Sequence, residues 1–132
     1  MSSIFSKIVN REIPAYIVAE NDKFLAFLDV FPLMEGHTLV IPKLEIDYFF
    51  DLDDNLLNEL NTFSKKVAIG LKKAIACKRI GMSVIGLEVP HAHIHLIPIN
   101  SIDDMNFSNN KLTLTDQDFL NISNKIKQKI RL

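Results

Sequence analysis

The sequence predicts an α+β fold with a mostly antiparallel sheet, and three features of the chain support this prediction. Short apolar segments separated by turn-forming residues occupy residues 15–42, a pattern typical of consecutive strands. A long stretch with apolar residues at steps of three and four follows, as in an amphipathic helix. A second group of short apolar segments and a final amphipathic stretch complete the chain. Residues 1–132 are therefore interpreted as one domain, which suits this length.

The first third of the chain is expected to form a short helix and three strands. The expected elements are a helix over residues 3–10, strands over 15–20 and 23–30, a loop over 31–36 and a strand over 36–42. Ser3 suits the N-cap of the helix, because its hydroxyl can accept a hydrogen bond from a free backbone N–H group. Asn21 and Asp22 suit the turn between the first two strands, since their side chains bond the local backbone. Both faces of the second strand are largely apolar, so we expect it to be covered on both sides.

The remainder of the chain is expected to form two helices and two further strands. The expected elements are a helix from Asp51 to about Lys78, strands over 80–86 and 88–98, an irregular loop over 100–110 and a helix from Thr115 to Ile130. Leu56, Leu60 and Phe63 begin the apolar stripe of the long helix, which predicts one buried face. Thr115 suits the N-cap of the last helix and has Asp118 three residues further on.

Composition and charge narrow the classes of function. The formal net charge is −1 at pH 7, so the chain offers no basic field for nucleic acid or for an acidic membrane surface. No apolar run approaches the roughly 20 residues of a membrane span. Cys77 is the only cysteine, which excludes an internal disulfide. Together with the lack of a signal peptide pattern, this predicts a cytoplasmic protein.

Three of the four histidines lie in one stretch, residues 88–98, and alternate with apolar residues. The alternating residues are His91, Ala92, His93, Ile94, His95 and Leu96. Side chains of a strand point to opposite faces with a period of two, so the imidazoles should line one face and the apolar residues should pack into the core. Pro90 and Pro98 bracket the stretch, which favours a strand over a helix. Three imidazoles on one rigid face indicate a functional site.

Two polar residues elsewhere are candidates for the same site. Asp29 ends the second strand, where it is either a strand-terminating carboxylate or a hydrogen-bond acceptor that faces a ligand. His37 begins the third strand. A lone histidine there is usually a satisfied core residue, but the three histidines of the other stretch favour a functional role.

Three interpretations of the histidine stretch follow from the residues. The histidines could be structural and bond only to one another. They could bind zinc, because His-x-His on a strand supplies metal ligands, with Glu88 and His37 available to complete the site. They could carry out chemistry at phosphorus, because one neutral imidazole can attack, a second can bond a non-bridging oxygen or deliver a proton, and a third can fix a tautomer. Their side-by-side arrangement favours the chemistry at phosphorus.

The chain also resembles a known family. Residues 91–97 follow its pattern of three histidines separated by single apolar residues, and further segments match upstream in the same order. These segments are residues 4–8, 12–15, 27–29 and 37–43. The chain is similar to the histidine triad (HIT) superfamily of nucleotide hydrolases and transferases, and within it to the branch that cleaves nucleoside phosphoramidates. The resemblance covers residues 3–98.

The resemblance implies a fold, an assembly and a ligand. The fold is a five-stranded antiparallel sheet with a long helix, and two subunits pair across a two-fold axis into a ten-stranded sheet. The ligand is a purine nucleotide or nucleotide conjugate whose α-phosphate lies at the histidines, and no metal or other cofactor is required. The substrates would be nucleoside phosphoramidates or related conjugates, with dinucleoside polyphosphates as a further option.

The resemblance also implies roles for individual residues. His93 is the nucleophile that becomes nucleotidylated, and His95 binds the α-phosphate. His91 and His37 orient these two residues within a chain of hydrogen bonds. Asp29 accepts hydrogen bonds from the ribose hydroxyls. The apolar slot around the base is formed by Phe5, Ile8, Phe27 and Val30.

Two features depart from the family pattern. Residues 82–88 lack the usual Asn and Gln, and Glu88 stands where relatives place a hydroxyl or an amide beside the phosphate. A carboxylate there repels a phosphate unless it is protonated or turned away, so Glu88 could donate a proton or bond an imidazole. The second departure is residues 99–132, a C-terminal extension with a helix. The altered stretch also leaves open a nucleotide sensor or scaffold with little catalysis.

Overall fold

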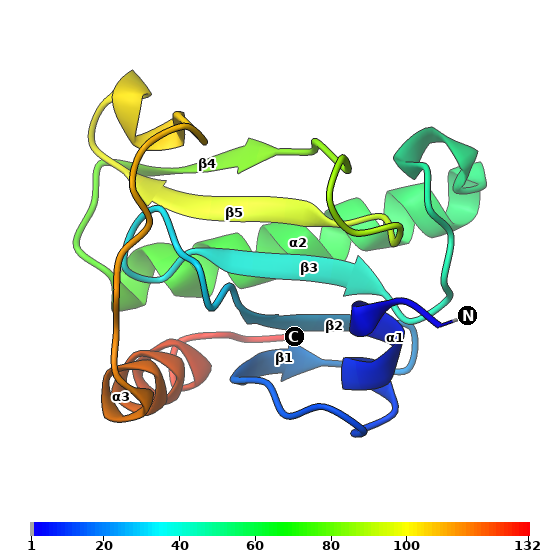
Figure 1. The fold of residues 1–132 in the computed structure, drawn as a ribbon, viewed down its shortest axis with the longest axis horizontal. Coiled ribbons are helices and arrows are strands. Elements are labelled where there is room, and N and C mark those ends of the chain that lie inside the picture. Colours follow the sequence, from blue (N-terminus) through cyan, green and yellow to red (C-terminus); the bar gives the residue numbers. More distant parts are fainter. Residues whose placement is uncertain (1) are drawn as a thin grey trace.

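The computed structural model describes residues 2–132 and confirms the predicted α+β fold with a five-stranded antiparallel sheet (Figure 1). The helices and strands are α1 (Ile4–Val9), β1 (Ile17–Glu20), β2 (Phe24–Leu28), β3 (Thr38–Pro42), α2 (Asp54–Ala74), β4 (Arg79–Ser83), β5 (Ile94–Ile99) and α3 (Asp116–Lys127). Short 3₁₀ turns cover Phe49–Asp51 and Ile102–Met105. The strand order is β1-β2-β3-β5-β4, with every neighbouring pair antiparallel. β3 and β5 are therefore adjacent, although α2 and β4 separate them in the sequence.

The two faces of the sheet carry different layers. α2 and α3 pack on one face, where their apolar stripes meet alternate residues of the strands. The residues that the helices bury there are Leu60, Phe63, Val67 and Leu71 from α2 and Phe119, Ile122 and Ile126 from α3. On the opposite face α1 buries Phe5 and Ile8 against residues of β2 and β3. All five residues of β2 are buried, as its two apolar faces predicted.

Local sequence sets the ends of the helices. The N-caps predicted at Ser3 and Thr115 are both present, because each hydroxyl accepts a hydrogen bond from a backbone N–H group of its own helix. The long helix is shorter than predicted at both ends. Residues 49–51 form a separate 3₁₀ turn before it, and Ile75 ends it by adopting an extended backbone with φ −114° and ψ 125°.

The histidine strand also differs from the prediction. β5 covers Ile94–Ile99, so His91 and His93 lie in the loop that precedes it. The chain leaves the sheet there because the Ala92 N–H group bonds to the Ile46 carbonyl, at 2.7 Å, instead of to a strand partner. The predicted alternation of side chains is nevertheless present, since the apolar residues of the stretch belong to the core under α2.

Gly86 lies before the histidines in the sequence, and Pro98 lies after them. Gly86 has φ +75°, the left-handed conformation that glycine adopts easily, and it lies in the loop between β4 and β5. Pro98 does not end the strand as predicted. It lies inside β5 opposite Ile80 of β4, beyond the last residue of β5 that pairs with β3.

The C-terminal extension packs back onto the sheet and α2. Tyr16, just before β1, stacks on Phe119 of α3 with ring centroids 5.0 Å apart. Ile130 lies against α2 at Gly70, where an added β-carbon would come within 2.6 Å of the Ile130 side chain and 2.8 Å of its backbone. Ile130 therefore packs directly against the backbone of α2, where Gly70 has no side chain.

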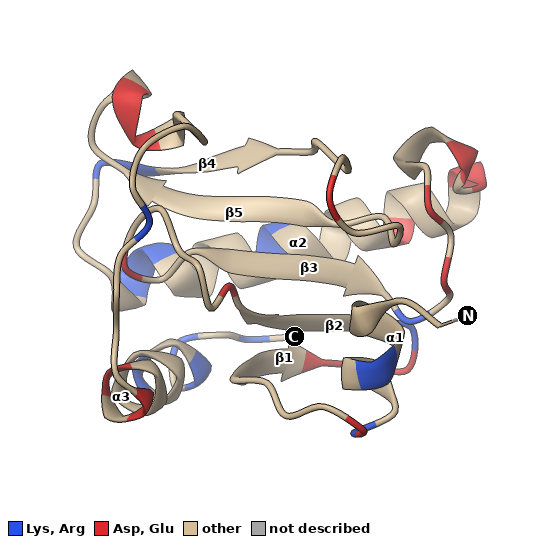
Figure 2. Ribbon diagram, in the orientation of Figure 1, with Lys and Arg blue, Asp and Glu red and all other residues tan. Residues whose placement is uncertain are grey.

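The charged side chains and the hydrophobic helices of the fold are distributed as follows. Figure 2 shows Lys and Arg on the helices and connecting segments, whereas β2, β3 and β5 carry none of them. Within residues 2–132, none of the helices combines the length and the hydrophobicity needed to span a bilayer.

Candidate active site

The fold brings all four histidines and Asp29 together on the face of the sheet that α1 covers. His37 precedes β3, His95 lies in β5, and His91 and His93 lie in the loop before β5. The histidines are almost fully buried, with exposed fractions of 1% for His37, 0% for His91, 6% for His93 and 8% for His95. The ring of His95 has its centroid 5.0 Å from that of His93 and 5.2 Å from that of His37. Three imidazoles thus form a continuous row.

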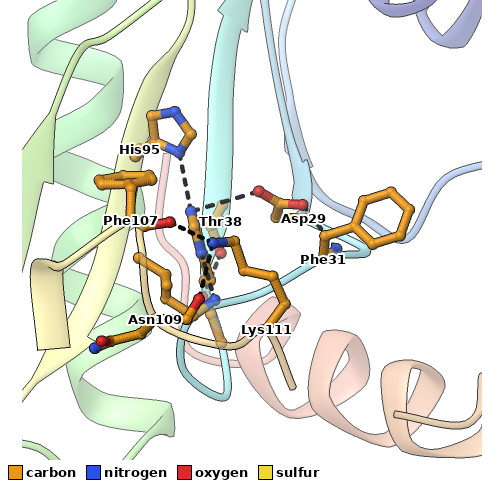
Figure 3. Close-up of polar contacts among 10 residues, drawn as sticks. Asp29, Phe31, Thr38, His95, Phe107, Asn109 and Lys111 are labelled. Atoms are coloured by element: carbon orange, nitrogen blue, oxygen red, sulfur yellow. Dashed lines mark hydrogen bonds and ion pairs between the residues drawn. The ribbon is translucent and has the colours of Figure 1, made fainter. Parts of the chain in front are cut away.

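Hydrogen bonds fix the protonation of His37 and His95 (Figure 3). The Leu33 N–H group donates to Nδ1 of His37 at 3.0 Å, so this nitrogen carries no proton. Neutral His37 therefore holds its proton on Nε2, which donates to Nδ1 of His95 at 2.9 Å. Because Nδ1 of His95 accepts, its Nε2 carries the proton. His95 can consequently donate a hydrogen bond from Nε2 to an anion.

A backbone carbonyl fixes the tautomer of His93. Nδ1 of His93 lies 2.7 Å from the carbonyl oxygen of His91, which can only accept, so Nδ1 carries the proton. Nε2 of neutral His93 then has a free lone pair, the state that a nucleophilic imidazole needs. Both ring nitrogens of His91 are bonded within the protein, since Nε2 donates to the Pro42 carbonyl at 2.7 Å and Nδ1 lies 2.8 Å from Ser3 Oγ.

Burial keeps the imidazoles neutral. Burial, followed by charge repulsion from His95 and Lys111, lowers the pKa of His37 to about 3. Burial and then the neighbouring His93 lower the pKa of His95 to about 4. Burial also lowers the pKa of His91 and of His93, although the carbonyl that each one bonds acts in the opposite direction. At pH 7 the site therefore contains neutral rings, as the assignment of tautomers requires.

Asp29 lies beside this row, directly after β2 (Figure 3). One carboxylate oxygen accepts a hydrogen bond from the Phe31 N–H group at 2.8 Å, and the other lies 3.6 Å from Nε2 of His37. Burial raises the pKa of Asp29, whereas the Phe31 N–H group and the charge of Lys111 lower it. The negative charge of Glu88 also raises this pKa. The exposed Glu88 side chain is thus within electrostatic reach of the site.

Three of the four residues predicted to surround a base lie together. Phe5, Ile8 and Phe27 belong to one buried cluster. The ring of Phe5 is edge-on to Phe27, with centroids 5.4 Å apart, and to His93, with centroids 5.1 Å apart. Val30 is 49% exposed and lies outside this cluster. The cluster therefore adjoins the imidazole whose Nε2 is free.

Known proteins and solved structures that are similar to this chain identify its family. Residues 10–102 match the HIT domain family. The chain belongs to the HIT family. It is 38% identical to an uncharacterized HIT-like protein of Borreliella burgdorferi, over 96% of this chain and 97% of that protein. It is 35% identical to the adenosine 5'-monophosphoramidase of Saccharomyces cerevisiae, over 72% of this chain and 61% of that protein. The crystal structure of a HIT-like protein from Bartonella henselae has a TM-score of 0.85 and 30% identity, covering 98% of this chain and 96% of that chain.

Three residues of the candidate site could also hold a metal ion. A carboxylate oxygen of Asp29 and one ring nitrogen each of His37 and His95 lie within 4.8 Å of one another. Nε2 of His37 and Nδ1 of His95 are already joined by a hydrogen bond of 2.9 Å. An ion would have to displace the proton that they share, because metal ligands must be deprotonated.

The candidate site has one wall that the sequence did not predict. Phe107, from the C-terminal extension, lies edge-on to His95 with ring centroids 4.9 Å apart, and its centroid is 6.3 Å from that of His37 (Figure 3). Lys111 stabilises this loop, since its Nζ donates to the carbonyl of Phe107 at 2.7 Å and to that of Asn109 at 3.2 Å. The polar composition of the loop gives no sign of this contact, because the contact depends on tertiary packing.

The aromatic rings leave the site of this HIT protein nearly closed. Phe5 and Phe107 pack against His93 and His95, so only small parts of the two imidazoles reach the solvent. A hollow of about 570 Å³ lies elsewhere, between α2 and β4. Met82 of β4 and the buried Ser64 of α2 are among the residues that line it.

Proposed function

We propose that this HIT protein is a nucleotide hydrolase or transferase that acts at the α-phosphorus of a nucleoside phosphoramidate or a related nucleotide conjugate. One observation carries the proposal: the carbonyl of His91 holds the proton of His93 on Nδ1, at 2.7 Å, and so leaves a free lone pair on Nε2. The ring of His95, whose Nε2–H group can donate to an anion, is the next ring in the row. A nucleophile and a donor for a phosphate oxygen are thus neighbours.

The proposed reaction consists of two displacements. Nε2 of His93 attacks the α-phosphorus while the bond from phosphorus to the leaving group breaks, which gives a positively charged nucleotidyl-histidine. The Nδ1–H group continues to donate to the His91 carbonyl and so disperses that charge. Nε2–H of His95 bonds a non-bridging oxygen, or passes its proton to the leaving group. Water then attacks phosphorus, and the bond to His93 breaks as the nucleoside monophosphate leaves. The proton that the water loses returns to Nε2 of His95 if that ring has protonated the leaving group, and otherwise passes to the released group.

We propose that Asp29 accepts hydrogen bonds from the ribose hydroxyls and that apolar residues hold the base. The apolar residues are Phe5, Ile8, Phe27 and Val30. The first three adjoin His93 through the edge-on contact of Phe5, which would bring a bound nucleoside next to the nucleophile. Glu88 would be turned away from the phosphate or serve as a proton donor, because its negative charge would otherwise oppose binding.

The substrate class is supported by the yeast relative, which is named as an adenosine 5'-monophosphoramidase and is 35% identical over 72% of this chain. We therefore propose a purine nucleoside phosphoramidate as the first substrate to test. Dinucleoside polyphosphates are the second, since they offer the same α-phosphorus. A nucleotide sensor with little catalysis is the alternative from a different class, because Glu88 introduces a negative charge near the site.

The deciding experiment is mass spectrometry of the protein quenched during turnover of adenosine phosphoramidate. The proposal expects an added adenylyl group on the peptide that contains His93, and none in His93→Ala. An adduct located on another residue would refute the assignment of the nucleophile. Binding of adenosine monophosphate without turnover would favour the sensor. Loss of activity on treatment with a chelator, restored by zinc, would favour a metal hydrolase.

We also propose that two copies of the chain pair along β4 to give a ten-stranded sheet. β4 forms one edge of the sheet, and Met82, Val84 and Ile85 on and beside it are exposed. An open strand edge with apolar side chains favours pairing with another chain. Met82→Lys should convert dimers into monomers in analytical ultracentrifugation, and a wild-type protein that sediments as a monomer would refute the assembly.

The free thiol of Cys77 supports a cytoplasmic location.

A further inference from the structure

A cluster of polar side chains from outside the histidine stretch surrounds the ring of His91. Ser3 Oγ lies 2.8 Å from Nδ1 of His91, and Ser6 Oγ lies 3.5 Å from the same nitrogen. Glu45, from the segment after β3, accepts hydrogen bonds from the Ser3 N–H group at 2.5 Å and from Ser6 Oγ at 2.7 Å. Ser3 and His91 are buried, so the contact between them is shielded from water.

The protons of this cluster follow from its fixed partners. The Pro42 carbonyl accepts from Nε2 of His91, so Nδ1 of the neutral ring is an acceptor. The Ser3 hydroxyl is then the donor to Nδ1, while its lone pair accepts the Ser6 N–H group at 3.0 Å. One hydroxyl therefore caps α1 and also holds His91 in a single tautomer. A side chain that only accepts hydrogen bonds could do the first of these but not the second.

His91 is linked to the nucleophile through its own backbone. Its carbonyl accepts the Nδ1–H group of His93 at 2.7 Å. The next peptide is held by the bond from the Ala92 N–H group to the Ile46 carbonyl, also 2.7 Å. With its ring held at both nitrogens, His91 presents this carbonyl in one position. A shift of the ring would shift the group that aims His93.

We propose that Ser3 and Glu45 are positioning residues for the nucleophile His93 and that they act through His91. This inference rests on the proposed function and extends it to residues outside the histidine stretch. Ser3 holds the ring of His91 directly. Glu45 holds Ser3 and Ser6 as a carboxylate, and the hydrogen bonds from these serines keep the pKa of Glu45 well below its usual range.

The position of Ser3 also connects the two halves of the site. Ser3 caps α1, and α1 carries Phe5 and Ile8 of the proposed base-binding slot. Figure 1 shows α1 next to the carboxyl end of β3, from which the segment with Glu45 continues. Movement of α1 would therefore displace both the proposed base-binding slot and the ring of His91, which is proposed to position His93.

The test compares three substitutions of Ser3 in the full chain. Ser3→Ala removes the cap and the donor, Ser3→Asp keeps an acceptor for the cap but cannot donate to His91, and Ser3→Thr keeps both. We expect kcat on adenosine phosphoramidate to fall about tenfold or more in the first two variants, because small errors in the aim of a reacting group are costly. Ser3→Thr should recover most of the activity. Ser2→Ala, at the exposed neighbouring serine, is the matched control and should equal the wild type.

Nitrogen-15 NMR of the imidazoles gives a second readout that requires no turnover. The wild type should show His91 protonated on Nε2 and His93 protonated on Nδ1, and Ser3→Asp should add a proton to Nδ1 of His91, because the Pro42 carbonyl keeps the proton on Nε2. If Ser3 only capped α1, Ser3→Ala would raise KM or lower Tm while kcat and the NMR signals stayed unchanged, and this result would overturn the proposal. If the wild type proved inactive, the proposed function would fail, but the tautomers would still decide whether Ser3 holds His91.

Substitutions of Glu45 test the second residue of the proposal. Glu45→Gln keeps an acceptor oxygen and should stay within about threefold of the wild-type kcat, whereas Glu45→Ala should lower kcat more, in the same direction as Ser3→Ala. Equal kcat values for Glu45→Ala and the wild type would remove Glu45 from the proposal. If Ser3→Ala does not fold, Ser3→Asp decides the role of Ser3, because that variant keeps the helix cap.

Discussion

The two faces of the sheet bury their side chains to nearly the same extent but for different ends. On the face that α2 and α3 cover, Ala92, Ile94 and Leu96 are at most 2% exposed and form part of the apolar core. On the α1 face, His93 and His95 are 6% and 8% exposed, yet each ring bonds a fixed partner through Nδ1. Burial stabilises the fold on the first face, whereas on the second it lowers proton affinity. The α1 face differs from the apolar face because its buried side chains have oriented polar partners.

The largest effect is expected from the removal of the proposed nucleophile. His93→Ala should lower kcat at least about 10³-fold, because no other group would supply the attacking lone pair. Thermal unfolding should change little in comparison, since the apolar face is untouched. Steady-state kinetics with a calorimetric scan of the same sample checks both. Activity within a few-fold of the wild type would place the nucleophile elsewhere.

The adjacent residue should show the opposite pattern. Ile94→Ala should lower the free energy of unfolding by about 2–5 kcal/mol, the usual cost of truncating a buried aliphatic side chain. The kcat of the folded fraction should stay within a few-fold, because Ile94 packs under α2. Denaturant titration measures the first quantity, and activity at low temperature measures the second. A kcat loss as large as that of His93→Ala would show that the two faces are not separable.

A substitution of Asp29 should separate substrate binding from catalysis on the α1 face. Asp29→Ala should raise KM for adenosine phosphoramidate about tenfold or more, because hydrogen bonds to a charged acceptor are lost. The value of kcat should change less, since the row of imidazoles is intact. A substrate that lacks the ribose hydroxyls should show no difference between variant and wild type. The reverse split, with kcat falling more than KM rises, would refute the ribose assignment.

Acid should affect the histidine face selectively. In the unfolded chain these histidines titrate near their ordinary pKa of 6.5, whereas in the folded chain His37 and His95 titrate at about 3 and 4. At pH values between the pKa of the folded chain and that of the unfolded chain, the unfolded chain binds more protons than the folded chain. The free energy of unfolding therefore decreases progressively as the pH falls below 6.5. The acid limb of kcat/KM should likewise lie below pH 6.5, because burial lowers the pKa of His93. A limb above pH 6.5 would contradict a buried neutral nucleophile.

The smallest effect is expected from the wall of the site. Phe107→Ala should expose His95 to water and raise the pKa of its ring toward the ordinary value, since burial is the main cause of its lowering. Proton NMR titration of the histidines measures this shift. We expect kcat to change only a few-fold. Leu112→Ala, at an exposed residue of the same segment, is the control and should leave the titration of His95 unchanged.

The fold was largely predictable because its signals are local. A period of two assigned Ala92, Ile94 and Leu96 to the core correctly, even where the chain is outside the sheet. The start of β5 was wrong, because the bond from Ala92 to Ile46 is a tertiary contact that the alternation does not encode.

The grouping of the four histidines with Asp29 was predictable, but the residues that support this candidate site were not. Four histidines and Asp29 do lie together, since the order of the strands brings β2, β3 and β5 side by side. Ser3 and His91, however, are 88 residues apart in the sequence, and Phe107 reaches His95 from a loop without any periodic pattern. Contacts of this kind depend on how the helices and loops pack against the sheet, which local sequence patterns do not encode.

Gly70 shows how the long helix and the end of the chain constrain each other. Ile130 occupies the space above its Cα so closely that any side chain at position 70 would collide with the Ile130 backbone. Residue 70 and the path of the tail can therefore change only together during evolution. In a relative with a β-carbon at this position, the final residues must run along another route, so a single column of an alignment would distinguish the two arrangements.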